Sequence, residues 1–372
     1  MKPIRVLHVF ASLDRGGAEA MIMNIYRQID REKVQFDFLV NDTKPEYAFE
    51  AEAKSLGANI YRLPRYNFIN ALTYLKKCRK LFKTHGHGNW QIVHGHYKAA
   101  GYLYFPVAKQ LNMTTISHAH IAGTQRTFKS YFRKPFRKLT NDQSEHLFTC
   151  STEAAQYTYG SKASKAILIE NAVDTHKFQF DPVLREEKRA ALGLQDKTLY
   201  AHVGRFSEQK NHMFLIDIFK EITKLDPTAV LLLVGDGTLR KTVEAKVKTL
   251  ALENQVIFTG IRSDVDALLS AFDVMLMPSL FEGLPVSVIE AQSTGLPCLI
   301  SDTISPEVLV TPLAQNAALT DSSETWAKKA ISMVSQNRSV EAAALVKSAG
   351  YDIRNTAEKI TQLYLDMARK SE

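Results

Sequence analysis

The sequence has few cysteines, no long apolar run, no repeat of fixed period and no low-complexity tract. Its 372 residues include three cysteines, Cys78, Cys150 and Cys298, which are odd in number and far apart. This pattern argues against a disulfide framework and a cysteine zinc site, and it fits a reducing cytoplasm. Because no stretch of about 18 apolar residues occurs, no membrane-spanning helix is predicted. The first apolar run ends at Ser12 and is too short for a signal peptide.

Acidic residues are missing from a quarter of the chain. Residues 53–141 contain 16 Lys and Arg but no Asp or Glu, although the net charge of the whole chain is only +8. Within them, Arg126–Lys138 (RTFKSYFRKPFRK) interleaves six cations with four aromatic rings. Such a mixture suits an anionic membrane surface or single-stranded nucleic acid, and a merely solubilising face is the alternative. We expect an anionic partner.

Apolar runs typical of buried strands alternate with segments of helical spacing. Ile4–Phe10 is the first predicted strand, and a glycine turn, a helix and the strand Val34–Val40 follow. This order implies a parallel sheet. A charged segment at 178–193 is predicted to hold the domain boundary, and a second series of strands and helices begins at Leu199.

We therefore predict an α/β protein of two Rossmann-like, doubly wound domains that face a central cleft. The predicted domains span residues 1–175 and 190–354. A C-terminal helix at about 355–372 is expected to pack back on the first domain. Within that domain, Phe68–Thr84 is predicted to be a basic helix.

Histidines occur in three His-x-His pairs in the first half of the chain, namely His85/His87, His94/His96 and His118/His120. In a strand, residues i and i+2 face the same side, so metal binding has to be considered. No third ligand is evident beside any pair, so no metal site is expected. We expect instead that His118 or His120 faces a ligand at the end of its strand.

The segment Phe281–Gln292 (FEGLPVSVIEAQ) follows the apolar run Asp273–Ser279 and carries two acids. Ligands of open α/β sheets bind beyond the carboxyl ends of the strands, which would place Glu282 in a ligand loop and Glu290 inside the next helix. A carboxylate there can accept hydrogen bonds from a ribose diol, and free N–H groups at Gly283–Val286 can donate to sugar or phosphate. Taken alone, two such glutamates are more often unrelated acids that share no ligand.

Further polar residues and glycines follow predicted strands. Arg205 and Lys210 lie five apart in the loop GRFSEQKN, and both cations suit a diphosphate. Gly235 and Gly237 follow the strand Ala229–Val234 and would permit close backbone approach. Each feature alone is more often a surface charge or a turn.

Taken together and in this order, the motifs resemble those of the retaining, nucleotide-sugar-dependent glycosyltransferases of the GT-B fold, family four. The chain is similar to members that build bacterial exopolysaccharide or capsule. The motifs that carry the resemblance are RGGAE at 15–19, NAVD at 171–174, GRFSEQKN at 204–211, VGDG at 234–237, FTGIRSDV at 258–265 and PSLFEGLPVSVIEAQSTGLP at 278–297.

The resemblance implies a role for each matching position. Arg205 and Lys210 would hold the donor diphosphate and stabilise charge on the leaving group. Glu290 would bind the ribose, and Glu282 would hold the sugar. The catalytic residues implied are Arg205, Lys210, Glu282 and His120. The donor-binding residues implied are Gly16, Gly17, His118, Gly204, Gly235, Gly237, Arg262, Gly283, Leu284, Pro285, Val286 and Glu290.

The reaction implied is a front-face transfer with retention of anomeric configuration, with no carboxylate nucleophile, no metal and no cofactor, since the nucleotide sugar is a substrate. A UDP-sugar is favoured by family frequency. The acceptor is expected to be a lipid-linked diphosphate or an oligosaccharide. We expect a cytoplasmic enzyme held at the inner face of the membrane through Arg126–Lys138 and the acid-free segment 53–141, with no nucleic acid as partner.

Two alternatives stay open at this point. One is a nucleotide-sugar epimerase or phosphorylase of the same architecture, and the other is a non-enzymatic module that binds an anionic ligand. The sequence also leaves open the donor sugar, the base, the acceptor, the oligomeric state and the choice between His118 and His120.

Overall fold

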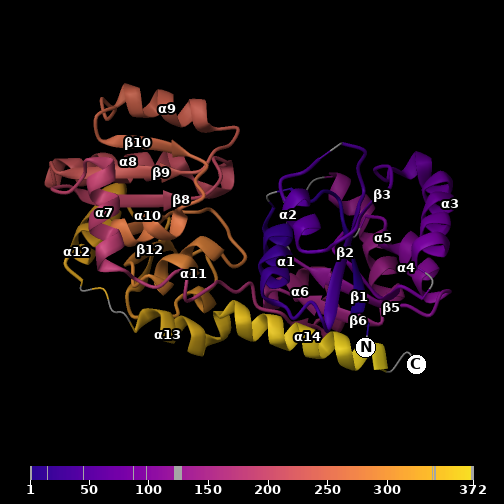
Figure 1. The fold of residues 1–372 in the computed structure, drawn as a ribbon. Coiled ribbons are helices and arrows are strands. Elements are labelled where there is room, and N and C mark those ends of the chain that lie inside the picture. The colour runs from indigo at the N-terminus through magenta and orange to yellow at the C-terminus, as the bar shows by residue number, and fades with distance from the viewer. Residues whose placement is uncertain are drawn as a thin grey trace. The chain divides into compact units, whose positions relative to one another are not determined.

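The chain forms two compact units in a computed structural model (Figure 1). It describes residues 2–14, 16–44, 46–86, 88–97, 99–120, 128–336, 338 and 341–369, without the side chains of 128–134. The first unit joins Met1–Asn171 to the C-terminal segment Ile353–Glu372, and the second unit is Ala172–Asp352. Among the described residues, none of the helices combines the length and the apolar character needed to cross a membrane.

The first unit is built on a seven-stranded parallel sheet with the order β3-β2-β1-β4-β5-β6-β7. Its strands are β1 (Ile4–Phe10), β2 (Val34–Val40), β3 (Ile60–Arg62), β4 (Trp90–Gly95), β5 (Thr114–Ala119), β6 (His146–Thr149) and β7 (Ile167–Leu168). Its helices are α1 (Gly17–Gln28), α2 (Glu50–Ser55), α3 (Ala71–Leu81), α4 (Gly101–Lys109), α5 (Phe128–Gln143), α6 (Thr152–Tyr159) and α14 (Ile353–Arg369).

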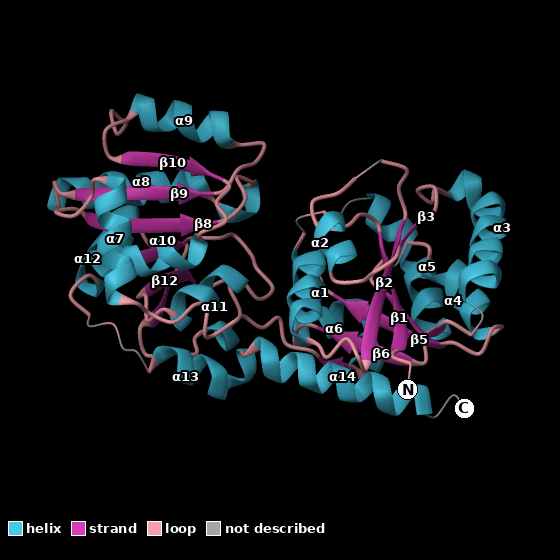
Figure 2. Ribbon diagram, in the orientation of Figure 1, coloured by secondary structure: helices cyan, strands magenta, loops and turns pink. Residues whose placement is uncertain are grey.

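Alternation along β1 separates the two faces of this sheet. Leu7 and Val9 face the cluster formed with α3 and α4, whereas His8 lies on the other face. That second face is covered by α1 and α14, and Tyr364 of α14 contacts the His8 ring. Figure 2 shows α14 running beside the strands of this unit. The last helix of the chain is therefore part of the core of the first unit.

The second unit repeats the plan with a six-stranded parallel sheet in the order β10-β9-β8-β11-β12-β13. Its strands are β8 (Thr198–Val203), β9 (Ala229–Val234), β10 (Val256–Gly260), β11 (Val274–Met277), β12 (Cys298–Ser301) and β13 (Ala314–Ala317). Its helices are α7 (Pro182–Leu192), α8 (His212–Leu225), α9 (Arg240–Thr249), α10 (Val265–Ala271), α11 (Val286–Ser293), α12 (Ser323–Met333) and α13 (Ala342–Val346). Two parallel α/β sheets confirm the predicted doubly wound fold.

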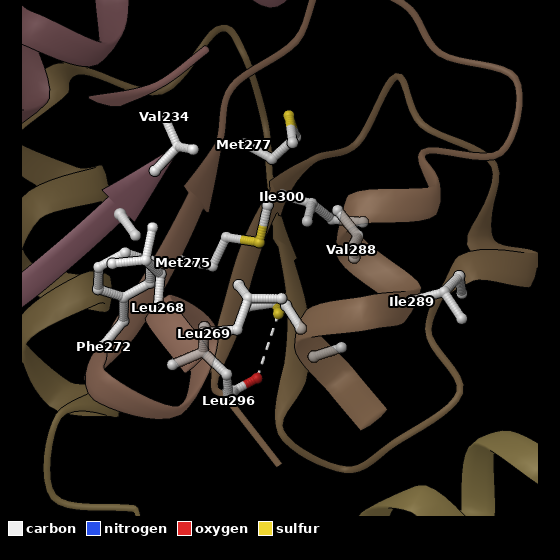
Figure 3. Close-up of a cluster of buried hydrophobic side chains, with 14 of the residues drawn as sticks. Val234, Leu268, Leu269, Phe272, Met275, Met277, Val288, Ile289, Leu296 and Ile300 are labelled. Carbon is white, nitrogen blue, oxygen red and sulfur yellow. Dashed lines mark hydrogen bonds between the residues drawn. The ribbon is translucent and has the colours of Figure 1, made fainter. Parts of the chain in front are cut away.

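Both faces of the second sheet are apolar, as expected for a sheet covered by helices on both sides. Met275 and Met277 of β11 pack with Val288 of α11 in one cluster, while Leu276 packs in the cluster on the opposite face. Figure 3 shows the first cluster, with Val288 of α11 beside the strands. This packing fixes α11 and hence the position of the loop that precedes it.

The first unit ends upstream of the predicted boundary. The segment 178–193 is not a connector, because it holds α7, which packs on α10. The Asp181 carboxylate caps this helix by accepting from the N–H groups of Val183 and Leu184, and Pro182 occupies its first turn. Gly193 ends it with φ of +66°. The start signal at Asp181 and Pro182 and the stop signal at Gly193 are present in the sequence, but the charged composition of the segment favoured a connector.

One other prediction differs in detail from the structure, and one concerns a segment that is only partly described. The predicted helix Phe68–Thr84 is divided into a 3₁₀ turn at Phe68–Asn70, helix α3 and a π-turn at Phe82–Gly86. Of the basic segment Arg126–Lys138, residues 126 and 127 lie outside the described part, and the rest begins α5. The described side chains of that segment start at residue 135.

Candidate active site

The loops after β8 and β11 meet at the point where the strand order of the second sheet reverses. These strands are neighbours in the sheet although three helices and two strands separate them in sequence. The N–H of Leu280, after β11, donates to the carbonyl of Gln209, after β8, at 2.8 Å. Such a switch point is where open α/β sheets bind their ligands.

Lys210 and Glu282 form an ion pair between these two loops. Lys210 Nζ lies 2.7 Å from Glu282 Oε1, and both side chains are largely shielded from solvent, at 14% and 9% exposure. Gln209 Nε2 donates to Glu282 Oε2 at 3.0 Å and to the carbonyl of Phe281 at 3.0 Å. The structure thus brings together two of the residues assigned to catalysis and adds Gln209 as their partner.

Glycines allow the loops to pack this closely. A Cβ at Gly204 would lie 3.0 Å from Lys210 Cε, so the lysine stem lies directly over this glycine. Gly235 has φ of +136°, and a Cβ there would lie 2.1 Å from the carbonyl oxygen of Gly204. A Cβ at Gly237 would lie 2.4 Å from the carbonyl oxygen of Phe206. Gly235 and Gly237 therefore require glycine for contact between the β8 and β9 loops.

The two predicted arginines differ in their surroundings. Arg205 is exposed and makes no ion pair with any residue the structure describes, so its guanidinium is available to an anion. Arg262 instead donates to Asp264 at 2.8 and 2.7 Å, and Lys188 reaches the same carboxylate at 2.7 Å. This pairing holds the pKa of Asp264 far below its ordinary value. Arg262 is therefore tied to its own loop.

Glu290 lies in α11, one turn after the helix begins. Burial raises the pKa of its carboxyl to about 7, an effect that Lys177 opposes and Asp266 reinforces. Helix α11 begins after Pro285 with no side chain capping its first N–H groups, and a Cβ at Gly283 would meet no atom within 4 Å. Leu284 and Val286 pack against the neighbouring apolar cluster, which fixes this uncapped helix start.

The sequence did not reveal two buried histidines near Lys210, namely His202 and His212. The Nδ1–H group of His202 in β8 donates to the carbonyl oxygen of Leu276 at 2.8 Å. The ring of His212 stacks on Phe206 with 4.2 Å between centroids. Burial, His212 and Lys210 place the pKa of His202 well below its ordinary value, and burial and Lys210 lower that of His212 to about 4. Both imidazoles are neutral. A histidine inside the apolar run TLYAHV was the available signal.

The remaining predicted residues lie in the first unit. Gly16 precedes α1 and Gly17 begins it, with the Glu19 carboxylate folded over Gly16. His118 lies in β5, and His120 follows that strand. The structure places a third histidine near two of the His-x-His pairs, which the sequence spacing had not revealed.

The chain matches two family models, Glycosyltransferase Family 4 over residues 15–177 and Glycosyl transferases group 1 over residues 185–352. EpsF of Bacillus subtilis (strain 168), named as a glycosyltransferase, is 32% identical, with 97% of this chain and 96% of that protein covered. CapH of Staphylococcus aureus, a capsular polysaccharide biosynthesis glycosyltransferase, is 24% identical over 97% of this chain and 99% of its own.

A more local match joins 37% of this chain to 37% of an Escherichia coli enzyme, with 37% identity. That enzyme is named UDP-Gal:alpha-D-GlcNAc-diphosphoundecaprenol alpha-1,3-galactosyltransferase. Among solved structures, Anabaena HepE in complex with UDP-glucose has a TM-score of 0.79 at 18% identity, covering 97% of this chain and 99% of its own. The whole-length match to EpsF and the shared fold show that this chain belongs to the family-four glycosyltransferases of GT-B fold, related to enzymes of exopolysaccharide and capsule synthesis.

Proposed function

We propose that this glycosyltransferase moves a sugar from a UDP-sugar to a lipid-linked diphosphate or oligosaccharide acceptor, with retention of anomeric configuration. The observation that carries the proposal is the Lys210–Glu282 pair at the switch point, beside the exposed Arg205. A cation and a carboxylate that partner each other in the free protein can exchange partners when a diphosphate and sugar hydroxyls arrive. The UDP-glucose complex of HepE and the name of the Escherichia coli relative support the choice of donor and acceptor class.

In this proposal, Arg205 and Lys210 bind the donor diphosphate and stabilise the charge that develops on it as the sugar leaves. Charge-assisted hydrogen bonds of this kind contribute about 1.5–3 kcal/mol each. The uncapped N–H groups at the start of α11 add positive potential to the same region. With these groups in place, the diphosphate needs no metal ion for neutralisation, and the leaving phosphate accepts the proton of the acceptor hydroxyl.

The two carboxylates bind different parts of the donor. Glu290 accepts hydrogen bonds from the ribose hydroxyls, and Glu282, with the backbone at Gly283–Val286, holds the sugar. The loop at 260–265, with Arg262, contacts the base. The roles implied for Gly16, Gly17, His118 and His120 belong to the first unit and stay a prediction.

We also propose that the first unit binds the inner surface of the membrane, where a lipid-linked acceptor resides. The 3₁₀ turn and the start of α3 expose Ile69 to 98% and Leu72 to 77%, which is exceptional for large apolar side chains. Exposed basic residues follow them, namely Lys76, Lys77, Arg79 and Lys80 of α3 and Lys83 of the π-turn after it. Phe68 contacts Phe136 of α5 at 4.9 Å, which joins this tip to the basic helix. An apolar tip ringed by cations suits anionic lipid.

The test uses the purified full chain, a panel of UDP-sugars and a lipid-diphosphate sugar acceptor, without added metal. Transfer with an α-linked product from an α-linked donor is expected, measured by anomeric proton signals of the product. Arg205→Ala and Lys210→Ala should each reduce turnover by about 100-fold or more, whereas Lys241→Ala, which removes an exposed lysine of α9, should not. Unchanged turnover in both site variants would refute the proposed roles.

The alternatives make different predictions. An epimerase would convert the donor without acceptor, and an anion-binding module would bind nucleotides without consuming them. The comparisons do not favour either, because the matched family is one of glycosyltransferases over both units.

A further inference from the structure

Five histidines gather on one face of the first sheet, at the point where its strand order reverses. His8 of β1 lies opposite His94 of the neighbouring strand β4 in the parallel register. Two residues further on is His96, and the adjoining strand β5 supplies His118 and, just beyond its end, His120. Neighbouring rings lie 4.0 to 5.1 Å apart between centroids. Three strands thus aim five imidazoles into one region.

The inner histidine His94 is held at both ring nitrogens. Its Nδ1 lies 2.6 Å from the hydroxyl oxygen of Tyr364 in α14, and its Nε2 lies 3.1 Å from Nδ1 of His118. Burial raises the pKa of the tyrosine well above its ordinary value, so the hydroxyl stays neutral. A consistent assignment has His94 Nδ1–H donating to Tyr364 and His118 Nδ1–H donating to His94. His118 then presents Nε2 away from the inner ring.

His96 also has a histidine partner at each ring nitrogen. Its Nε2 lies 3.0 Å from Nδ1 of His8, and its Nδ1 lies 2.7 Å from Nε2 of His120. When His96 Nε2–H donates to His8, the lone pair of His96 Nδ1 faces His120. His8 and His94 therefore orient the rings of His96 and His118.

We propose that His96, His118 and His120 bind a divalent transition-metal ion such as Zn²⁺. Each of these residues offers one ring nitrogen, and the three nitrogens all lie within 4.8 Å of one another. His118 lies in β5, His120 follows the end of that strand by one residue, and His96 directly follows the neighbouring strand β4. Ligands 2.0–2.1 Å from a tetrahedral zinc are about 3.3 Å apart, which small side-chain rotations here would achieve.

The partners of the ligands strengthen this assignment. Histidine ligands of metals almost always donate their second nitrogen to another group, which fixes the tautomer and the ring orientation. His94 serves His118 in this way, and His8 serves His96. A second trio within the same distance, His8, His94 and His96, shares His96 with the first, but both ring nitrogens of its His94 are engaged in hydrogen bonds. In the outer trio, the contact between His96 Nδ1 and His120 Nε2 has to give way to the ion.

The donor set selects the class of metal. Three imidazoles suit Zn²⁺, Cu²⁺, Ni²⁺ or Co²⁺, whereas Mg²⁺ and Ca²⁺ prefer oxygen ligands. Three protein ligands leave the fourth position for water or a substrate oxygen.

This site stands apart from the proposed role of Arg205 and Lys210, because it lies in the first unit and its occupancy is measured without a donor. It shares His120 with the residues expected to face the sugar. Loss of metal binding would therefore leave the transferase proposal intact, and loss of transfer would leave the metal proposal intact.

The experiment titrates Co²⁺ and Zn²⁺ into the full-length, tag-free protein after chelator treatment and dialysis. We expect one equivalent of Co²⁺ to bind with the visible absorption of a tetrahedral or five-coordinate complex, and Zn²⁺ to displace it. His96→Gln should weaken binding by about 100-fold or more, and His8→Phe, which removes only a supporting ring, by about 10-fold. The matched control His176→Gln removes an exposed histidine of the second unit and should bind metal as the parent does.

Absence of the Co²⁺ absorption from the parent protein would overturn the proposal, as would binding that His96→Gln leaves unchanged. Circular dichroism shows whether each variant is folded. Should His96→Gln fail to fold, His120→Gln replaces it, because His120 is partly exposed at the rim of the cluster. Undiminished binding in a folded His120→Gln variant would likewise count against the site.

Discussion

Lys210 Nζ lies 2.7 Å from Oε1 of Glu282, across the loops that follow the neighbouring strands β8 and β11. The lysine that is proposed to hold the diphosphate is thus neutralised in the free protein by the acid that is proposed to hold the sugar. A nucleotide diphosphate must compete with that carboxylate for the ammonium group. Removal of Glu282 should therefore free the lysine for the diphosphate, whereas removal of Lys210 should weaken diphosphate binding.

The first prediction concerns this pair. Glu282→Gln keeps the side-chain size but frees the charge of Lys210, so UDP affinity should stay the same or increase by up to about tenfold, while sugar transfer falls by about 100-fold. Lys210→Ala should weaken UDP binding by about tenfold or more, because charge-assisted hydrogen bonds are lost. Calorimetric titration with UDP and a transfer assay measure the two quantities. Weaker UDP binding in Glu282→Gln would contradict the exchange of partners.

The second prediction separates the two glutamates. Glu290→Ala should weaken the binding of bare UDP by about tenfold, since a carboxylate that accepts from a ribose diol is removed. Glu282→Ala should spare bare UDP and impair transfer. Both variants are measured by the same titration. An equal loss of UDP affinity in the two would overturn the division of roles.

The third prediction follows from the pKa of Glu290, which burial raises from 4.5 to about 7. Between these two values the folded protein holds a proton that the unfolded chain releases, so this residue makes stability fall as pH rises from about 4.5 to 7. Glu290→Gln should therefore gain stability relative to the parent protein as pH rises through that window. Urea unfolding at pH 5 and pH 7.5 gives the comparison. If the difference in unfolding free energy between Glu290→Gln and the parent protein is the same at both pH values, the pKa of the Glu290 carboxyl is not raised.

The same proton affects ligand binding. Only the ionised carboxyl accepts hydrogen bonds from both ribose hydroxyls, so UDP affinity should rise as pH increases from 6 to 8, on either side of the value of about 7. The pH dependence should be reduced in Glu290→Gln. The pH dependence of UDP binding to Lys241→Ala provides the baseline for charge changes elsewhere.

The fourth prediction concerns the glycine contacts beneath the site. Gly235→Ala places a methyl group 2.1 Å from the Gly204 carbonyl oxygen in a backbone with φ of +136°, so it should destabilise the second unit by about 3 kcal/mol or more. Gly283→Ala is the matched control, because a Cβ there meets no atom within 4 Å, and its stability should change by less than about 0.5 kcal/mol. Denaturant titration followed by circular dichroism measures both. Equal stability of the two variants would refute the close approach.

The fifth prediction tests the exposed apolar tip. The double variant Ile69→Asp with Leu72→Asp should lose most binding to anionic vesicles, because two apolar side chains that would enter the lipid become charged. Its folding should be unchanged, since both side chains are exposed in the free protein. Leu225→Asp, an exposed leucine at the end of α8, is the control. Sedimentation with anionic and with zwitterionic vesicles, at low and high salt, separates lipid binding from general adhesion.

The sequence predicted the two sheets because their strands are nearly continuous apolar runs between turn signals. Ile4–Phe10 and Ala229–Val234 have the same bounds in the structure as in the prediction. Helix α7 was missed because its charged face hid the cap at Asp181 and the stop at Gly193. Local sequence patterns predict a strand or helix well when apolar residues dominate it. They predict a charged amphipathic helix near a domain boundary, such as α7, less well.

Contacts between distant residues were beyond the sequence for a different reason. Glu282 and Lys210 could each be placed at the end of a strand, but their ion pair requires β8 and β11 to be neighbours. The same holds for His8 and His94, which come together only because β1 pairs with β4. Strand order in a sheet is set by the packing of the whole unit and leaves no mark in a local run of residues.

Helix α14 has a consequence for how the protein is made. Tyr364 on this helix contacts His94, which precedes it by 270 residues, and the sheet face carrying the histidines is covered in part by the same helix. During synthesis the second unit, Ala172–Asp352, is contiguous and can close as soon as it emerges from the ribosome. The first unit must wait, with part of one sheet face uncovered, until α14 has followed the second unit out of the ribosome. Although its strands are made before the second unit, the first unit therefore completes its fold after it.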